Sequence, residues 1–219
     1  MIMMMMMIKE PVVLSDSDRT GDATTGRVLG VLLAAGAGRR AGGPKALRVD
    51  ADGTSWLLRS IAVLRDGGCD AVIVVLGCEA ERAHGILADS ALAADPAIIV
   101  VDAPDWEQGM GSSLRSGLLA ARAASWRAAL VHLVDLPDVT ADVVRRLIRQ
   151  APAGTSALLR AAYAGTPGHP VLIGRDHLEP IMTGLAGDRG AKDYLARHGA
   201  HSVECGDLAS GQDDDGQRT

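Results

Sequence analysis

The stretch VLGVLLAAGAGRRAGGPKAL, residues 28–47, joins an apolar run to a loop rich in glycine and cations. The run at 28–35 predicts a buried strand, because strands covered on both faces read as continuous aliphatic segments. Backbone N–H groups of a glycine loop can surround an anion, and arginine and lysine add positive charge. The loop contains Gly36, Gly38, Gly42, Gly43, Arg39, Arg40 and Lys45. The segment therefore predicts a triphosphate site at the end of the first strand.

Two common phosphate-binding loops do not match this segment. A Walker loop needs serine or threonine after its lysine, whereas Ala46 follows Lys45 here. The dinucleotide fingerprint needs a third glycine where Ala41 stands, and an acid after the second strand, which ends in Leu76-Gly77. The loop is thus of another nucleotide-binding type.

Apolar runs alternate with helical patterns along the rest of the chain. Further strands are expected at 70–77, 97–103, 128–137, 156–163, 170–174 and 201–206, and helices at 54–68, 79–89, 111–125, 141–150 and 190–199. This alternation predicts right-handed βαβ units and an α/β fold that is Rossmann-like, with three αβα layers and a mostly parallel sheet. Ligands of such sheets bind at the carboxyl ends of the strands.

The composition limits the partners and the compartment. The net charge is −5 and no long basic block is present, which argues against a nucleic-acid partner. The apolar start of the chain is too short to span a membrane, so no membrane partner is expected. Three scattered cysteines form neither a disulfide framework nor a metal knuckle, which favours a cytoplasmic protein.

The length of 219 residues suits one α/β domain with flanking segments. Polar, low-complexity composition predicts a disordered extension at 1–27 and a disordered tail at 209–219, which leaves 28–208 as the domain.

Five motifs in order resemble the single-domain nucleotidyltransferases, and more narrowly the molybdenum-cofactor nucleotidyltransferases of the cytidylyl and guanylyl branches. The motifs are Leu33-Ala34-Ala35-Gly36-x-Gly38-x-Arg40-x-Gly42-x-x-Lys45, then Gly109-Met110-Gly111-Ser112-Ser113-Leu114-x-x-Gly117, Asp135-Leu136-Pro137, Gly168-His169-Pro170-Val171, and Gly187-Asp188-x-Gly190-Ala191. The resemblance extends over residues 28–205. The chain departs from the pattern at Ala41, where Met or Phe is usual, and at Lys192, where Arg is common.

The resemblance, together with the chemistry of the side chains, implies a role for each motif. Lys45 would lie over the α-phosphate and Arg40 would hold the leaving pyrophosphate. Asp135 and Asp188 would bind Mg²⁺, since hard carboxylate oxygens are its usual ligands. His169 and Pro170 would face the acceptor. The nucleotide would contact Leu33, Ala34, Ala35, Gly36, Gly38, Gly42, Gly109 and Ser113.

Several of these residues have a structural alternative. Ser113 reads equally as a contact to the base or ribose and as a residue near the N-cap of the predicted helix at 111–125. His169 could be a surface turn residue, and Asp188 a turn aspartate. His132 reads as a core residue within a strand. Trp106 reads as a packing residue that could also line a pocket.

The predicted function is Mg²⁺-dependent transfer of CMP from CTP to the phosphate of molybdopterin or molybdenum cofactor, with release of pyrophosphate. The expected partners are a nucleoside triphosphate, a phosphorylated pterin, and a molybdoenzyme or its chaperone. Three alternatives stay open: a guanylyltransferase of the same family, a sugar-phosphate nucleotidyltransferase, and a non-catalytic protein that carries the cofactor. Intact Lys45, Arg40 and Asp135 argue against a mere carrier.

Overall fold

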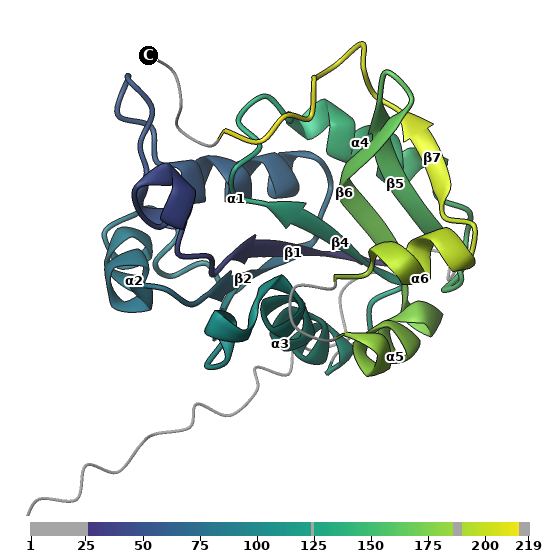
Figure 1. Cartoon of the computed structure of the whole chain (residues 1–219), viewed down its shortest axis with the longest axis horizontal. Coiled ribbons are helices and arrows are strands. Elements are labelled where there is room, and N and C mark those ends of the chain that lie inside the picture. The colour runs from purple at the N-terminus through teal and green to yellow at the C-terminus, as the bar shows by residue number, and fades with distance from the viewer. Residues whose placement is uncertain (1–25, 124, 186–189, 215–219) are drawn as a thin grey trace, which may run out of the picture.

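A seven-stranded sheet forms the centre of the molecule in the computed structural model, which describes residues 26–123, 125–185 and 190–214 (Figure 1). The strand order is β3-β2-β1-β4-β6-β5-β7. The strands are β1 (Val28–Ala34), β2 (Ala71–Leu76), β3 (Ile98–Asp102), β4 (Ala128–Leu133), β5 (Leu158–Tyr163), β6 (Thr166–Gly174) and β7 (His201–Glu204). β1 to β4 run parallel, while β6 runs antiparallel to both β4 and β5. The predicted α/β fold with a mostly parallel sheet is confirmed.

Helices cover both faces of the sheet, as expected for strands that are apolar throughout. One face packs against α1 (Trp56–Asp66), α2 (Ala80–Ala88) and α4 (Ala141–Gln150), and the other against α3 (Met110–Arg122), α5 (Arg175–Gly184) and α6 (Lys192–Arg197) (Figure 1). Short 3₁₀ helices lie at η1 (Arg39–Ala41), η2 (Lys45–Leu47) and η3 (Trp106–Gln108). None of the helices in the described ranges is both long and apolar enough to cross a membrane.

Alternate residues of each central strand pack into the two hydrophobic cores, one on each face of the sheet. In β1, Leu32 packs toward α1, whereas Val31 packs toward α3. His132 in β4 is fully buried, and burial lowers its pKa to about 3. Its ring is therefore neutral at pH 7, in agreement with a core position.

Helix α5 is absent from the expected elements. Pro180 lies inside it, and a proline within a helical pattern ordinarily indicates that the helix ends. Leu178, Ile181 and Met182 nevertheless share one buried face of this helix. Their packing against the sheet outweighs the hydrogen bond that Pro180 cannot donate.

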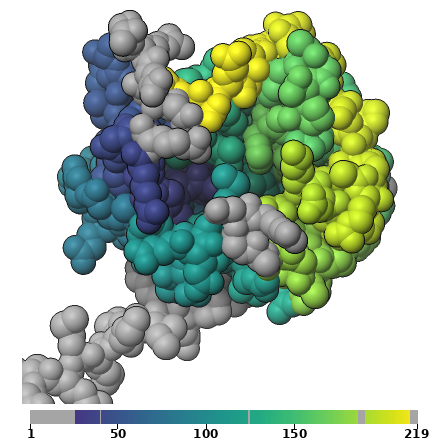
Figure 2. Space-filling view, in the orientation of Figure 1, coloured from purple at the N-terminus to yellow at the C-terminus, as the bar shows by residue number. Residues whose placement is uncertain are grey.

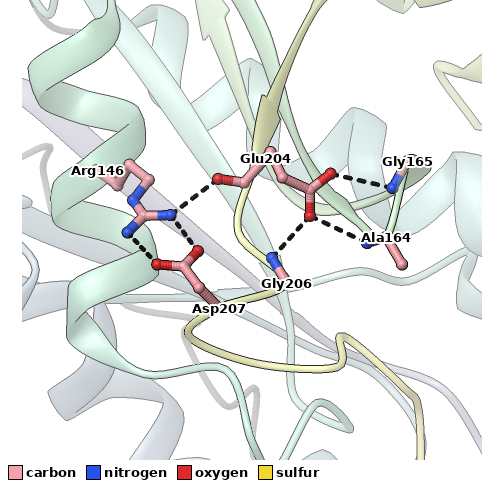
Figure 3. Close-up of polar contacts among 6 residues, drawn as sticks. All are labelled: Arg146, Ala164, Gly165, Glu204, Gly206 and Asp207. Atoms are coloured by element: carbon pink, nitrogen blue, oxygen red, sulfur yellow. Dashed lines mark hydrogen bonds and ion pairs between the residues drawn. The ribbon is translucent and has the colours of Figure 1, made fainter.

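A carboxylate from β7 holds the turn between β5 and β6 (Figure 3). Ala164 and Gly165 form this two-residue turn with φ of 49° and 78°. Glu204 accepts hydrogen bonds from the backbone N–H of Ala164 at 3.0 Å, of Gly165 at 3.0 Å and of Gly206 at 2.8 Å. Arg146 from α4 donates to the Glu204 carbonyl at 2.9 Å. One side chain thus ties the hairpin to the edge strand.

Glu204→Gln is expected to lower the melting temperature at pH 7, because an amide presents N–H to the N–H of one turn residue. The N–H groups of Gly165 and Gly206 hold the pKa of the Glu204 carboxyl below its ordinary value. The stabilisation is therefore complete above the unfolded value of about 4.3 and is lost as pH falls through the folded value. Thermal melts of wild type and variant from pH 7 to pH 3 are expected to converge at the acid end. Exposed Glu81→Gln is the matched control, and a Glu204→Gln melt equal to wild type at pH 7 would remove the role of this carboxylate.

Candidate functional site

The carboxyl ends of β1 and β4 open into a cavity of about 450 Å³. Its walls come from the glycine loop after β1, from η3, from the first turn of α3 and from residues 133–135 after β4. These segments are far apart in the sequence, and the parallel pairing of β1 with β4 brings them together. The cavity lies at the edge of the sheet where ligands of such folds bind.

The glycine loop is closed by hydrogen bonds to one of its own carbonyls. The carbonyl of Gly38 accepts from the N–H of Ala41 at 2.8 Å and of Gly43 at 3.2 Å. Gly38 has φ 56°, and a Cβ there would lie 2.0 Å from the Gly43 oxygen, so only glycine fits. Those two N–H groups are consequently used within the loop.

Gly36 lines the cavity without the positive φ that Gly38 has. Its φ is not positive, so conformational freedom does not explain the glycine. A Cβ at Gly36 would meet nothing within 4 Å, although the residue lines the cavity. A bare backbone at this point leaves room for a ligand to approach the chain closely.

Lys45 and Asp135 form an ion pair across the cavity. The Lys45 Nζ lies 2.8 Å from Asp135 Oδ2, and the side chains are 13% and 20% exposed. Lys45 follows the glycine loop, and Asp135 follows β4. The pair joins two motifs that are 90 residues apart in the sequence.

Helix α3 points its N-terminus toward the cavity. Gly109 is its N-cap residue, with φ 115°, and Gly109, Met110 and Ser113 line the cavity. Ser113 thus lies near the N-cap as expected, while the N-cap residue itself is Gly109, whose positive φ favours glycine. Ser113 lies in the first turns of the helix and is 6% exposed. The helix dipole and first N–H groups favour negative charge here.

Trp106 and Glu107 also line the cavity. Trp106 packs against Gly77, where a Cβ would lie 2.7 Å from the indole. The position of Trp106 three residues before the 109–117 motif is the sequence signal for this wall. Glu107 carries no comparable signal, because an exposed acid in a loop reads as solvated surface.

The structure brings most of the residues expected to contact the nucleotide to this cavity. Some of the expected site residues lie elsewhere. Ala34 is buried in the core behind it, and Gly42, His169 and Pro170 lie outside its lining. Asp188 falls outside the described residues, as does the side chain of Arg40. The cavity contains Leu33, Ala35, Gly36, Gly38, Lys45, Gly109, Ser113 and Asp135.

His169 on β6 and Arg160 on β5 are outside the lining of this cavity. Burial and then the charge of Arg160 lower the pKa of His169, which is about 4, while Asp135 opposes the shift. The His169 ring is thus within electrostatic reach of both residues and is neutral at pH 7. Burial also lowers the pKa of the Arg160 guanidinium.

Asp135 is suited to hold a divalent cation together with phosphate oxygens. Mg²⁺ in nucleotide sites is commonly bound through one or two carboxylates plus substrate phosphates and waters. Within the described ranges, no three His, Cys, Asp or Glu side chains gather into a metal cage. Asp135 at the end of β4, facing a cavity of about 450 Å³, therefore fits Mg²⁺ that binds together with a nucleotide.

The C-terminal segment lies against the same strand end. The Ser210 N–H and hydroxyl both donate to Asp138 Oδ2, at 2.5 and 2.6 Å. The N–H of Asp214 donates to the carbonyl of Asp135 at 2.9 Å. Figure 2 shows this yellow segment between the blue N-terminal third and the green β5–β6 region. We call residues 206–214 the C-terminal strap; its last part belongs to the tail expected at 209–219.

Comparisons with known proteins point to one family. Residues 30–203 match the family model of the MobA-like NTP transferase domain. The chain is 34% identical over 203 residues to nicotine blue oxidoreductase of Paenarthrobacter nicotinovorans, covering 89% of this chain and 95% of that protein.

Solved structures with the same fold include Rv0371c from Mycobacterium tuberculosis H37Rv, at 29% identity and TM-score 0.67, covering 83% of this chain and 89% of that one. A second Rv0371c structure, at 24% identity and TM-score 0.61, is a complex with manganese and covers 82% and 88%. A nucleotidyl transferase from Methanothermobacter matches at 22% identity and TM-score 0.65, over 82% and 87% of the two chains.

Proposed function

The chain belongs to the MobA-like NTP transferase family, and on this premise we propose that it transfers CMP from CTP to the phosphate of a molybdopterin-type acceptor. An acceptor phosphate oxygen attacks the α-phosphorus, the bond to the β-phosphate oxygen breaks, and pyrophosphate leaves with the electron pair. The observation that carries the proposal is the pairing of Lys45 with Asp135 inside a cavity bounded by the glycine loop.

Lys45 supplies the positive charge at the reacting centre. Its ammonium is held by Asp135 before substrate arrives, so little rearrangement is needed when a triphosphate enters. Charge builds on the α-phosphate oxygens in the transition state, and a preplaced cation stabilises that charge more than the ground state. Lys45 therefore acts mainly on the rate.

Asp135 would hold Mg²⁺, which when bound neutralises phosphate charge and orients the triphosphate. The manganese complex of Rv0371c supports a divalent cation in a protein of this fold. The glycine loop would hold the β- and γ-phosphates on the other wall, where Gly36 leaves the approach open. Trp106 and Met110 offer apolar surface to the base.

A second candidate follows from the relative named nicotine blue oxidoreductase, which is similar over 95% of its length. In that reading the cavity would bind a nicotinamide nucleotide, and Trp106 would pack against a planar aromatic acceptor that takes the hydride. Nothing in this reaction calls for a cation at an α-phosphate or a strand-end carboxylate. The Lys45–Asp135 pair therefore favours nucleotidyl transfer.

The test is pyrophosphate release by the purified protein with Mg²⁺, molybdopterin and each of CTP, GTP, ATP and UTP in turn. Release with CTP is expected. Release with GTP alone would keep the reaction and change the base. Absence of release with all four, together with oxidation of NADH or NADPH by a quinone-type dye, would replace the proposal by the oxidoreductase.

A further inference from the structure

A second polar region lies next to the cavity, on the side of β5 and β6. Arg160 on β5 pairs with Val171 on β6, and His169 stands two residues before Val171. Directly opposed residues on paired strands share a face, and Val171 packs toward α3 and α5, which places Arg160 on that face of the sheet. The charge of Arg160 acts on the His169 ring, so the two side chains lie near each other.

Arg160 has no counter-charge within the ranges 26–123, 125–185 and 190–214. Its Nε is buried and has no hydrogen-bond partner among these residues. Burial lowers the pKa of its guanidinium. Arg146, by contrast, donates to both oxygens of Asp207, at 2.5 and 2.8 Å. Keeping an unpaired, partly buried cation is costly, and such groups are normally paired.

His169 adds a neutral polar group to the same place. Its carbonyl accepts from the Tyr163 hydroxyl at 2.6 Å, which fixes the backbone that carries the ring. Gly168 lies against the Tyr163 ring, where a Cβ would come within 2.9 Å, so the chain packs tightly behind His169. The imidazole has one N–H to donate at neutral pH.

We infer that Arg160 and His169 form the subsite for the phosphate of the acceptor, beside Asp135 and across from the glycine loop. This inference rests on the proposed function. A guanidinium offers two parallel N–H groups that match two phosphate oxygens, and the His169 N–H donates to a third. Binding there compensates the charge of Arg160, whose Nε has no partner in the part of the chain that the structure describes.

The subsite separates the two anionic substrates of the reaction. Lys45 and the glycine loop face the triphosphate, and Arg160 faces the attacking phosphate from β5. The acceptor phosphate and the triphosphate repel each other. Cations on opposite sides are therefore needed to bring the two substrates together near Asp135. The arrangement assigns acceptor affinity to Arg160 and triphosphate chemistry to Lys45.

Arg160→Gln is expected to raise the KM for molybdopterin about 10- to 100-fold, as for loss of a charge-assisted hydrogen bond. The Kd for CTP, measured by calorimetry, is expected to stay within twofold of wild type. The melting temperature is expected to be unchanged or higher, because an unpaired cation is removed. Arg160→Lys is expected to recover part of the affinity. An unchanged KM with a lowered melting temperature would show a structural arginine and overturn the subsite.

A readout that needs no turnover separates this inference from the proposed function. The Nε–H resonance of Arg160, assigned by its loss in Arg160→Lys, is expected to shift saturably when inorganic phosphate is added. The exposed Arg149 is the control, and its Nε–H resonance is expected to stay in place. A saturable shift without pyrophosphate release from any NTP would keep the anion subsite and remove the proposed function. Transfer from CTP without a phosphate-dependent shift would do the reverse.

Discussion

Lys45→Met is expected to lower kcat for pyrophosphate release about 10³-fold, the upper range for removing one preplaced charge from a transition state. Methionine keeps much of the length and volume of the lysine stem but has no charge. The KM for CTP is expected to change much less, because the charge that Lys45 offsets develops mainly during the reaction.

The control for Lys45→Met is Arg149→Met, which removes a cation from the exposed side of α4 and is expected to leave kcat unchanged. Circular dichroism and a thermal melt establish that the variant folds. A folded Lys45→Met enzyme with kcat within threefold of wild type would take Lys45 out of the reaction. A loss that appears only in the KM for CTP would make Lys45 a binding residue instead.

Asp135→Asn is expected to lower turnover at saturating CTP by on the order of 10³-fold and to weaken the dependence on Mg²⁺ concentration. An amide has the shape of the carboxylate but lacks the charge that holds a divalent cation. The measurement is a Mg²⁺ titration of pyrophosphate release. Asp66→Asn, at the exposed end of α1, is the matched control. A normal Mg²⁺ titration curve in Asp135→Asn would move the cation to other groups.

The two residues also stabilise each other, and this can be separated from catalysis. Each single variant leaves a partly buried charge without its 2.8 Å partner and is expected to lower the free energy of unfolding by about 1–3 kcal/mol. The double variant Lys45→Met/Asp135→Asn leaves neither charge behind. The loss of unfolding free energy in the double variant is expected to be smaller than the sum of the two single losses, while activity stays absent.

The strands were predictable because their signal is local. Continuous aliphatic runs mark β1 and β2 without any knowledge of their neighbours. The antiparallel direction of β6 was not predictable, since period and composition carry no information on strand direction. The short turn at Ala164 and Gly165 is the single local cue to it.

The cavity was predictable in part for a similar reason. Local sequence alone predicts a binding role for the glycines and cations after β1 and for the aspartate after β4, because ligands bind at strand ends. Arg160 was not predictable, because a single arginine in the strand LLRAAY reads as a side chain facing water. Its significance comes from the buried Nε, which has no hydrogen-bond partner in the described ranges, and this burial exists only once β5 and β6 are folded.

The C-terminal strap bears on how the protein is handled at the bench. Asp214 donates to the carbonyl of Asp135 and precedes Thr219 by five positions. A purification tag, fluorophore or biosensor linker fused directly after Asp214 would therefore begin close to Asp135 and crowd the cavity. Val28 lies at the end of β1 opposite the cavity, so bulky groups placed next to Val28 stay away from Asp135.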